Sequence, residues 1–84
     1  MSPPRLELLT RPGCSLCTTA REIVERVATE TGTGWTERDV DDDADLADAY
    51  GDRVPVVLLD GAEHAYWRVE EDRLRNALAG RRTY

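Results

Sequence analysis

The chain has 84 residues, 40% hydrophobic and 33% charged, a composition that fits one globular domain and excludes a disordered chain. Its 11 basic and 17 acidic residues give a net charge of −6, which argues against nucleic acid or an anionic membrane as a partner. We therefore expect a single domain over residues 1–84, with a core at about 5–80, that acts as a monomer.

The location of the protein is predicted from its apolar segments. Met1 to Arg5 leads directly into a short apolar run and lacks the apolar core of a secretory signal. The longest nearly apolar stretch, Val54 to Leu59, is far too short to span a bilayer. We expect a cytoplasmic protein with no membrane partner. Since cytoplasmic thiols are normally kept reduced, its two cysteines are not expected to form a permanent disulfide.

The first half of the chain predicts a strand, a helix and a second strand. Residues 5–10 suit a strand with Leu6 and Leu8 on one face and Leu9 on the other. A helix is expected from Ser15 to about Thr29, because apolar residues recur there at helical spacing, namely Leu16, Ala20, Ile23, Val24 and Val27. Gly32 and Gly34 follow as its end. Residues 35–40 predict a second strand, whose charged side chains favour a sheet edge.

The second half predicts a short helix, a hairpin and a last helix. Asp42, three residues before Asp45, predicts the cap of a helix that ends at Gly51. Residues 56–59 form a β-prone apolar run, typical of a strand covered on both faces. Asp60-Gly61 then predicts a tight turn to a strand at residues 64–68. With a final helix at about 70–79, the order β-α-β-α-β-β-α predicts an α/β fold, a small mixed sheet with helices on both faces.

Cys14 and Cys17 form a Cys-x-x-Cys pair where the first strand is followed by the first helix. At the helix N-terminus, free backbone N–H groups favour a thiolate at Cys14. Cys17 stands one turn further on, within reach of a mixed disulfide formed at Cys14. Leu16 and the apolar face that follows it are expected to draw Cys17 inward and to leave Cys14 as the exposed member. Arg11, if it folds over the pair, adds a positive charge. This pattern predicts that Cys14 attacks a disulfide and that Cys17 resolves the product.

Other roles for the cysteines remain open at this point. Two inert cysteines would account for neither the spacing nor the strand-to-helix position. A closed structural zinc site needs four ligands, whereas the chain offers two cysteines and His64, so no metal site is predicted within one chain. A binding module with an idle cysteine pair is a further alternative. Elsewhere, His64 is expected to be solvated or packed against the hairpin, and Trp67 is a candidate for lining a substrate groove.

Val54-Pro55 precedes the buried strand and permits two interpretations. Proline is tolerated at the first residue of a strand, where its missing N–H does least harm. A cis bond would instead leave the backbone of Val54 free to pair with an incoming extended peptide.

Taken together, Pro12-Gly13-Cys14-x-x-Cys17 and Val54-Pro55 resemble the glutaredoxin and thioredoxin family, in particular small bacterial glutaredoxin-like proteins. The resemblance covers about residues 6–79. It implies a thioredoxin-like fold, with Cys14 as the attacking cysteine, Cys17 as the resolving one and Pro55 as a cis-proline that faces them. It also makes Arg11 the basic residue that these proteins often place before the active-site loop.

The resemblance implies a dithiol thiol–disulfide oxidoreductase that acts on protein or small-molecule disulfides. A thiol or a flavin-linked reductase would supply electrons; no tightly bound cofactor is expected, and glutathione is one candidate donor. The chain departs from glutaredoxins at Arg53, where they have threonine, and at residues 67–72, which lack their paired glycines. Because some glutaredoxins bridge an iron–sulfur cluster between two protomers through the first cysteine, cluster carriage through Cys14 is the alternative function.

Overall fold

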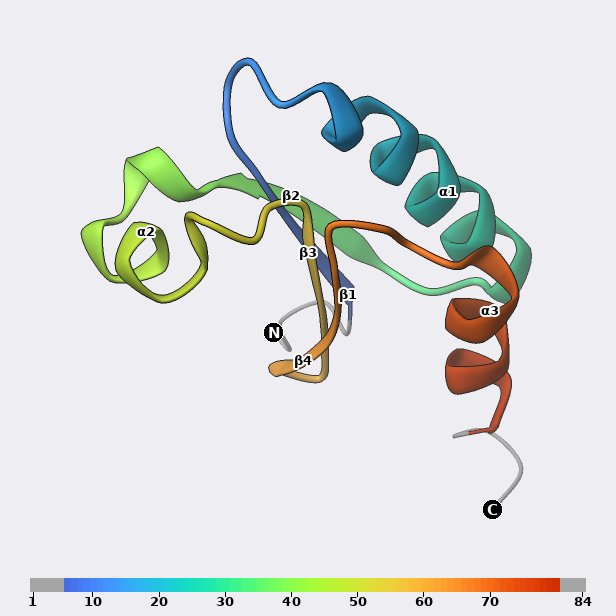
Figure 1. The fold of residues 1–84 in the computed structure, drawn as a ribbon. Helices are drawn as coiled ribbons and strands as arrows, with labels where there is room; N and C mark the ends of the chain where they lie inside the picture. Colours follow the sequence, from blue (N-terminus) through green and yellow to red (C-terminus); the bar gives the residue numbers. More distant parts are fainter. Residues whose placement is uncertain (1–5, 81–84) are drawn as a thin grey trace.

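The computed structural model describes residues 6–80. Its elements, in chain order, are β1 (Leu6–Thr10), α1 (Ser15–Thr31), β2 (Trp35–Asp39), the 3-10 helix η1 (Val40–Asp42), α2 (Ala44–Tyr50), β3 (Val56–Leu59), β4 (Ala62–Tyr66) and α3 (Glu71–Gly80). The predicted order β-α-β-α-β-β-α is confirmed, and η1 is added to it (Figure 1). The expectations for Met1 to Arg5 lie outside the described residues.

The four strands form one mixed sheet in the order β2-β1-β3-β4. β1 runs parallel to β2 and antiparallel to β3, and β4 pairs antiparallel with β3. The predicted edge position of the second strand is therefore confirmed. Because the parallel pair β1 and β2 is connected through α1, the start of that helix lies at the carboxyl end of β1, beside the centre of the sheet.

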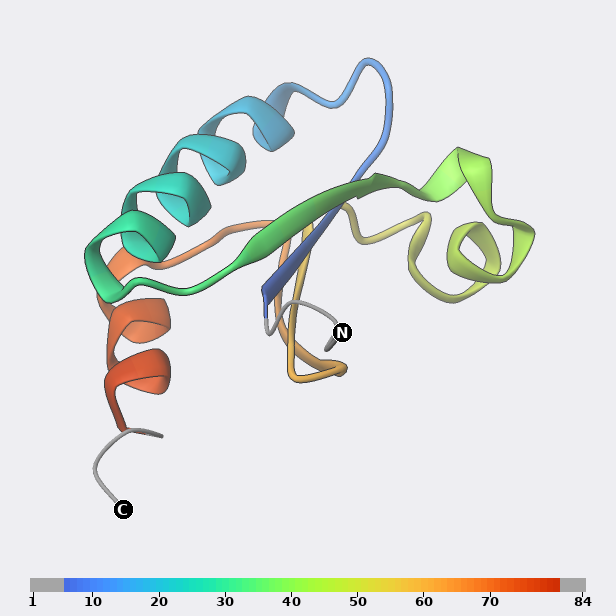
Figure 2. The same ribbon diagram turned by 180° about the vertical axis from the view of Figure 1, so that it is seen from behind.

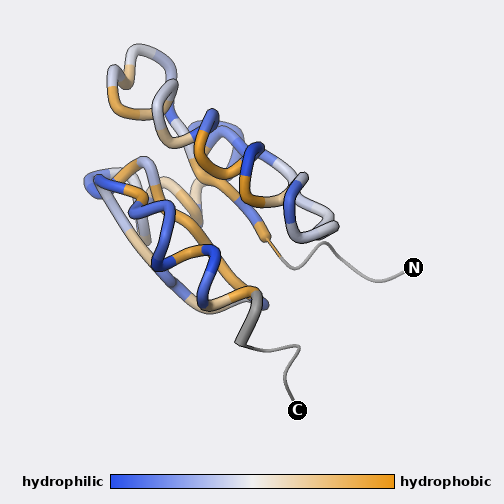
Figure 3. Tube along the Cα trace, turned by 90° about the vertical axis from the view of Figure 1, so that its right-hand side faces the viewer, coloured by the Kyte–Doolittle hydropathy of each residue, from blue (hydrophilic) through white to orange (hydrophobic). Residues whose placement is uncertain are grey.

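Helices cover both faces of the sheet. Figures 1 and 2 show α1 and α3 on one side and α2 on the other. Leu6 and Leu8 of β1 belong to the core beneath α1 and α3, whereas Leu9 belongs to the core beside α2. The helices carry hydrophobic and hydrophilic residues in alternation along their turns (Figure 3). The alternation predicted for the first strand is thus confirmed, and it explains how five residues serve two cores.

The boundaries of two elements differ from the prediction. α1 continues to Thr31, because the turn that stops it is formed by Gly32 in the left-handed conformation, at φ 66°. β4 begins at Ala62, directly after a turn in which Asp60 and Gly61 both have positive φ. It ends at Tyr66 rather than at residue 68, because Trp67 leaves the extended conformation, at φ 63°.

The predicted cap of the short helix was wrong by one residue. Asp39 accepts a hydrogen bond from the N–H of Asp41 and so begins η1, which uses Asp42 within its turn. α2 therefore begins later, and Asp43 caps it by accepting from the N–H groups of Asp45 at 2.9 Å and Leu46 at 3.4 Å.

Substitution of this cap has a defined expected cost. Asp43→Ala is expected to lower the free energy of unfolding by about 1 kcal/mol, because two amide donors at the start of α2 lose their acceptor. Asp42→Ala is the matched control and is expected to cost less than about 0.5 kcal/mol. Urea unfolding of both variants measures the difference, and equal losses would show that Asp43 is not the cap.

Candidate active site

The segment Arg11-Pro12-Gly13-Cys14 forms a tight turn that ends at the first helix. The N–H of Cys14 donates to the carbonyl oxygen of Arg11 at 3.2 Å, which closes the turn. Proline at its second position and Gly13 at its third, with φ 80°, are the residues that a type II turn requires. The turn brings the chain from β1 to α1 in four residues and places Cys14 at the N-cap of the helix.

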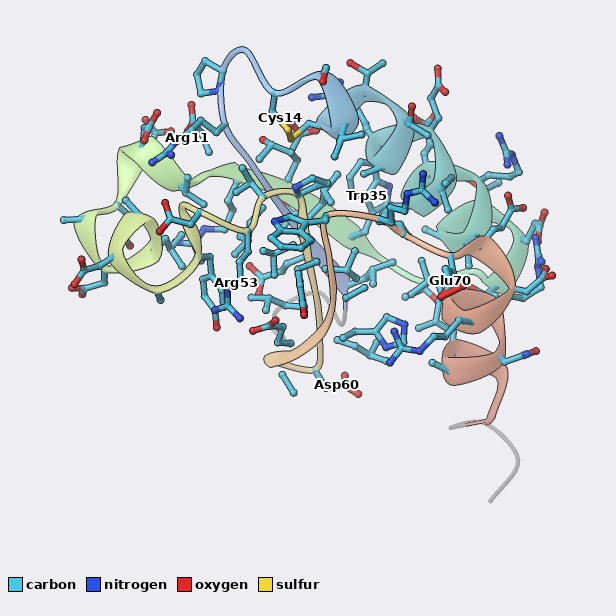
Figure 4. The ribbon with its side chains drawn as sticks, viewed as in Figure 1. Arg11, Cys14, Trp35, Arg53, Asp60 and Glu70 are labelled. Carbon is cyan, nitrogen blue, oxygen red and sulfur yellow. A yellow bond between two sulfur atoms is a disulfide. The ribbon has the colours of Figure 1, made fainter. Side chains whose placement is uncertain are left out.

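Cys14 and Cys17 are joined in a disulfide, with their Cα atoms 5.4 Å apart (Figure 4). Cys14 has the extended backbone of an N-cap, but its side chain makes no capping hydrogen bond. The first turn of α1 contains no acidic residue, so no carboxylate in that turn offsets the positive end of the helix. This arrangement provides a pair of sulfur atoms at a helix N-terminus, as the sequence predicted.

The two cysteines differ in exposure. Cys17 is 3% exposed, whereas Cys14 is intermediate. The predicted difference is confirmed: the apolar face that follows Cys17, with Ala20 and Val24 three and seven residues later, buries it on the same side of α1. Only the part expected of Leu16 was wrong, because Leu16 is 48% exposed. A reagent therefore meets Cys14 before it meets Cys17.

The peptide bond between Val54 and Pro55 is cis, as the second of the two interpretations expected, and the pairing of the Val54 backbone with a peptide stays a prediction. Pro55 is fully buried, and β3 begins at the next residue. The carbonyl oxygen of Pro55 accepts a hydrogen bond from the N–H of Trp67 at 2.9 Å. The segment after β4 is thus hydrogen-bonded to the loop between α2 and β3, residues 51–55, which we call the proline loop.

Arg11 binds groups on the α2 side of the molecule (Figure 4). Its Nε and Nη2 donate to Asp41 Oδ1 at 3.2 and 3.1 Å, and its Nη1 donates to the carbonyl oxygen of Gly51 at 3.1 Å. A Cβ atom at Gly51 would lie 2.5 Å from the carbonyl oxygen of Ala47 and 2.9 Å from Arg11 Nη2, so glycine is needed there. That Arg11 stabilises a thiolate at Cys14 stays a prediction. In such a role the thiolate would compete with Asp41 for the guanidinium.

A groove of about 340 Å³ lies between the first half of α1 and the segment that follows β4. α1 and the segment after β4 form its walls, with Leu16, Thr19, Ala20 and Ile23 on one side and Trp67, Arg68, Val69 and Glu70 on the other. Leu16 stands between the two cysteines in sequence, so one wall of the groove begins within the Cys-x-x-Cys segment. Trp67 lines a groove as expected, and that the groove takes a substrate stays a prediction. Leu16 is the wall residue that the sequence analysis missed. Its position between the cysteines was the available signal.

Glu37 of β2 and His64 of β4 both have lowered pKa values. The hydrogen bonds from Arg21 lower the pKa of Glu37, which also accepts from Thr10. Partial burial, together with the charge of Arg73, lowers the pKa of His64. Arg73 also donates to the carbonyl oxygen of His64 at 3.0 Å, so this half-buried histidine of β4 lies beside α3.

None of the helices in the described part of the chain, residues 6–80, has the length and apolar character needed to cross a membrane. No three histidine, cysteine, aspartate or glutamate side chains within this part of the chain lie close enough together to hold a metal ion.

A mixed sheet in this strand order, a Cys-x-x-Cys pair at the start of the first helix and a cis-proline before the third strand define a protein with the thioredoxin fold. The family model described as Glutaredoxin-like domain (DUF836) matches residues 5–79. The chain therefore belongs to this glutaredoxin-like family.

The chain is also similar to several known proteins. A Mycobacterium tuberculosis protein, described as uncharacterized, is 46% identical over 84 residues, which cover 94% of this chain and 87% of that protein. The X-ray structure of protein XcR50 from X. campestris is 33% identical, with a TM-score of 0.72, and the match covers 89% of this chain and 96% of the other. A mutant thioredoxin from Halobacterium salinarum is 30% identical, with a TM-score of 0.65, over 89% of this chain and 71% of the other.

Proposed function

We propose that the protein is a dithiol thiol–disulfide oxidoreductase. The observation that supports this most directly is a Cys14–Cys17 disulfide at the start of α1, with one cysteine accessible and the other buried. Positive helix ends stabilise thiolates, and the thiolate is the nucleophile in disulfide exchange. The asymmetry in exposure supports different roles for the two sulfur atoms.

The proposed cycle transfers two electrons from the cysteine pair to a substrate disulfide. The Cys14 thiolate attacks one sulfur of the substrate, the substrate S–S bond breaks, and the first substrate thiolate leaves and takes up a proton. Cys17, as a thiolate, then attacks the Cys14 sulfur of the mixed disulfide. The second substrate thiolate leaves, and the Cys14–Cys17 disulfide remains. An external thiol or a flavin-linked reductase reduces this disulfide and completes the cycle, as a reducing compartment such as the cytoplasm would allow.

The proline loop and Arg11 have supporting roles in this proposal. Val54 offers its backbone to an extended segment of the substrate, which is how exposed strand edges commonly bind peptides. Arg11 keeps the turn before Cys14 attached to α2 through Asp41 and Gly51, and its charge favours the thiolate.

Turnover of model disulfides by the purified wild-type protein tests the proposal. Bis(2-hydroxyethyl) disulfide and insulin serve as small and protein substrates. Three donors are compared: dithiothreitol, glutathione with its reductase, and a thioredoxin reductase with its nicotinamide cofactor. We expect catalysis above the protein-free rate with dithiothreitol, and the more effective of the other two systems identifies the class of physiological donor. Catalysis of neither disulfide by any donor would refute the proposed function.

A further inference from the structure

Trp67 adopts a backbone conformation that bulky residues rarely take. Its φ of 63° lies in the left-handed region, where glycine or asparagine is the usual residue. Its side chain is 53% exposed, so burial of the indole does not compensate for the conformation. Unfavourable backbone conformations of this kind tend to persist where the surrounding structure enforces them, often at functional sites. The conformation and the exposure of Trp67 together point to a functional role for the indole.

Three carbonyl oxygens of the proline loop hold Trp67 in place. The backbone N–H donates to Pro55 at 2.9 Å and to Arg53 at 3.3 Å. The indole Nε1–H donates to the carbonyl oxygen of Asp52 at 3.3 Å. The ring is thus fixed at its polar edge while more than half of the side chain stays exposed to solvent. An aromatic surface held in this way loses little conformational entropy when a ligand binds to it.

The exposed part of Trp67 belongs to one wall of the groove between α1 and the segment that follows β4. Leu16, 48% exposed, belongs to the opposite wall. The groove also contains one acidic and one basic residue, Glu70 and Arg68, so its formal charges cancel. Trp67 and Leu16, each about half exposed, therefore offer apolar surface from both walls of one groove.

Two cations outside the groove, Arg11 and Arg53, are engaged by carboxylates, and Arg68 shares the groove with Glu70. Arg11 pairs with Asp41, and Arg53 donates to Glu63 at 3.0 Å. A small charged thiol compound would have to displace these carboxylates to use either guanidinium. A polypeptide with an apolar residue beside its disulfide needs no such displacement. The balance of charge and apolar surface favours the polypeptide.

We infer that Trp67 is a specificity-determining residue, which holds an apolar side chain of a substrate polypeptide against Leu16 while the neighbouring disulfide meets Cys14. This inference rests on the proposed function and adds the class of substrate to it. The proline loop sets the position of the indole, and the indole in turn sets where the substrate chain lies.

The test compares Trp67→Gly with the wild type on insulin and on bis(2-hydroxyethyl) disulfide, with dithiothreitol as the reductant. Glycine takes the left-handed conformation readily and keeps the N–H that binds Pro55, so this variant is expected to fold. We expect the ratio of kcat/KM for insulin to kcat/KM for the small disulfide to fall about tenfold, through a higher KM for insulin. Leu16→Ser, on the opposite wall, is expected to lower the same ratio.

Trp67→Phe is the control, because it keeps an apolar ring and loses only the indole N–H. It is expected to keep the ratio within about threefold of the wild-type value. An unchanged ratio in Trp67→Gly, or equal losses on both substrates, would overturn the inference. A wild-type protein that turns over neither disulfide would instead refute the proposed function, so the two failures are distinguishable.

Discussion

Cys14→Ser is expected to reduce disulfide turnover to the rate measured without protein. Serine keeps the size and the N-cap position of the residue, but its hydroxyl does not form the thiolate that attacks a disulfide. Cys17→Ser, the same chemical change three residues later, is expected to stop the cycle at a different point. Its Cys14 still attacks, and the mixed disulfide then persists because the buried resolving sulfur is missing.

Mass spectrometry and activity together check this prediction. Incubation of reduced Cys17→Ser with glutathione disulfide is expected to add the mass of one glutathione, whereas Cys14→Ser is expected to add much less. Turnover of bis(2-hydroxyethyl) disulfide, measured for both variants, gives the matching loss of activity. Full activity of Cys14→Ser would reverse the assignment of the two roles. So would more glutathione on Cys17 of Cys14→Ser than on Cys14 of Cys17→Ser.

The second large effect is expected at the centre of the sheet. Leu8 is completely buried on β1, opposite Val57 of β3 and within the core beneath α1 and α3. Leu8→Ala removes buried apolar volume and leaves a cavity among strands that cannot collapse freely. We expect it to lower the free energy of unfolding by about 2 to 5 kcal/mol. That is a large part of the roughly 5 to 15 kcal/mol typical of a whole domain.

Leu16→Ala is the matched control, since it makes the same chemical change at a side chain that is 48% exposed. It is expected to cost less than about 0.5 kcal/mol in urea unfolding. If both variants lost the same stability, Leu8 would not lie in the main core. A selective effect of the Leu16 substitution on disulfide turnover, with stability unchanged, would agree with its place in the groove.

Much of the site follows from residues that are close together in the sequence. Pro12-Gly13 supplies the turn, the following apolar spacing supplies the helix, and the Cys-x-x-Cys pair places both sulfur atoms on its first turn. Local backbone preference and helical periodicity act over a few residues, so these features could be predicted. The alternation of Leu8 and Leu9 between two cores was predictable for the same reason. The ends of elements were harder to predict. Asp43 rather than Asp42 caps α2, because the 3-10 helix η1 before α2 already includes Asp42.

Contacts between distant residues were decided only in the folded chain. Arg11 binds Asp41, which lies 30 residues further along, rather than acting on the cysteines alone. Leu16 turned out to be exposed because Cys17, Ala20 and Val24 already filled the face of α1 that meets the sheet. The left-handed conformation of Trp67 depends on carbonyl oxygens of the proline loop more than ten residues earlier. Such choices balance local preference against long-range hydrogen bonds and packing, and that balance exists only once the strands have paired.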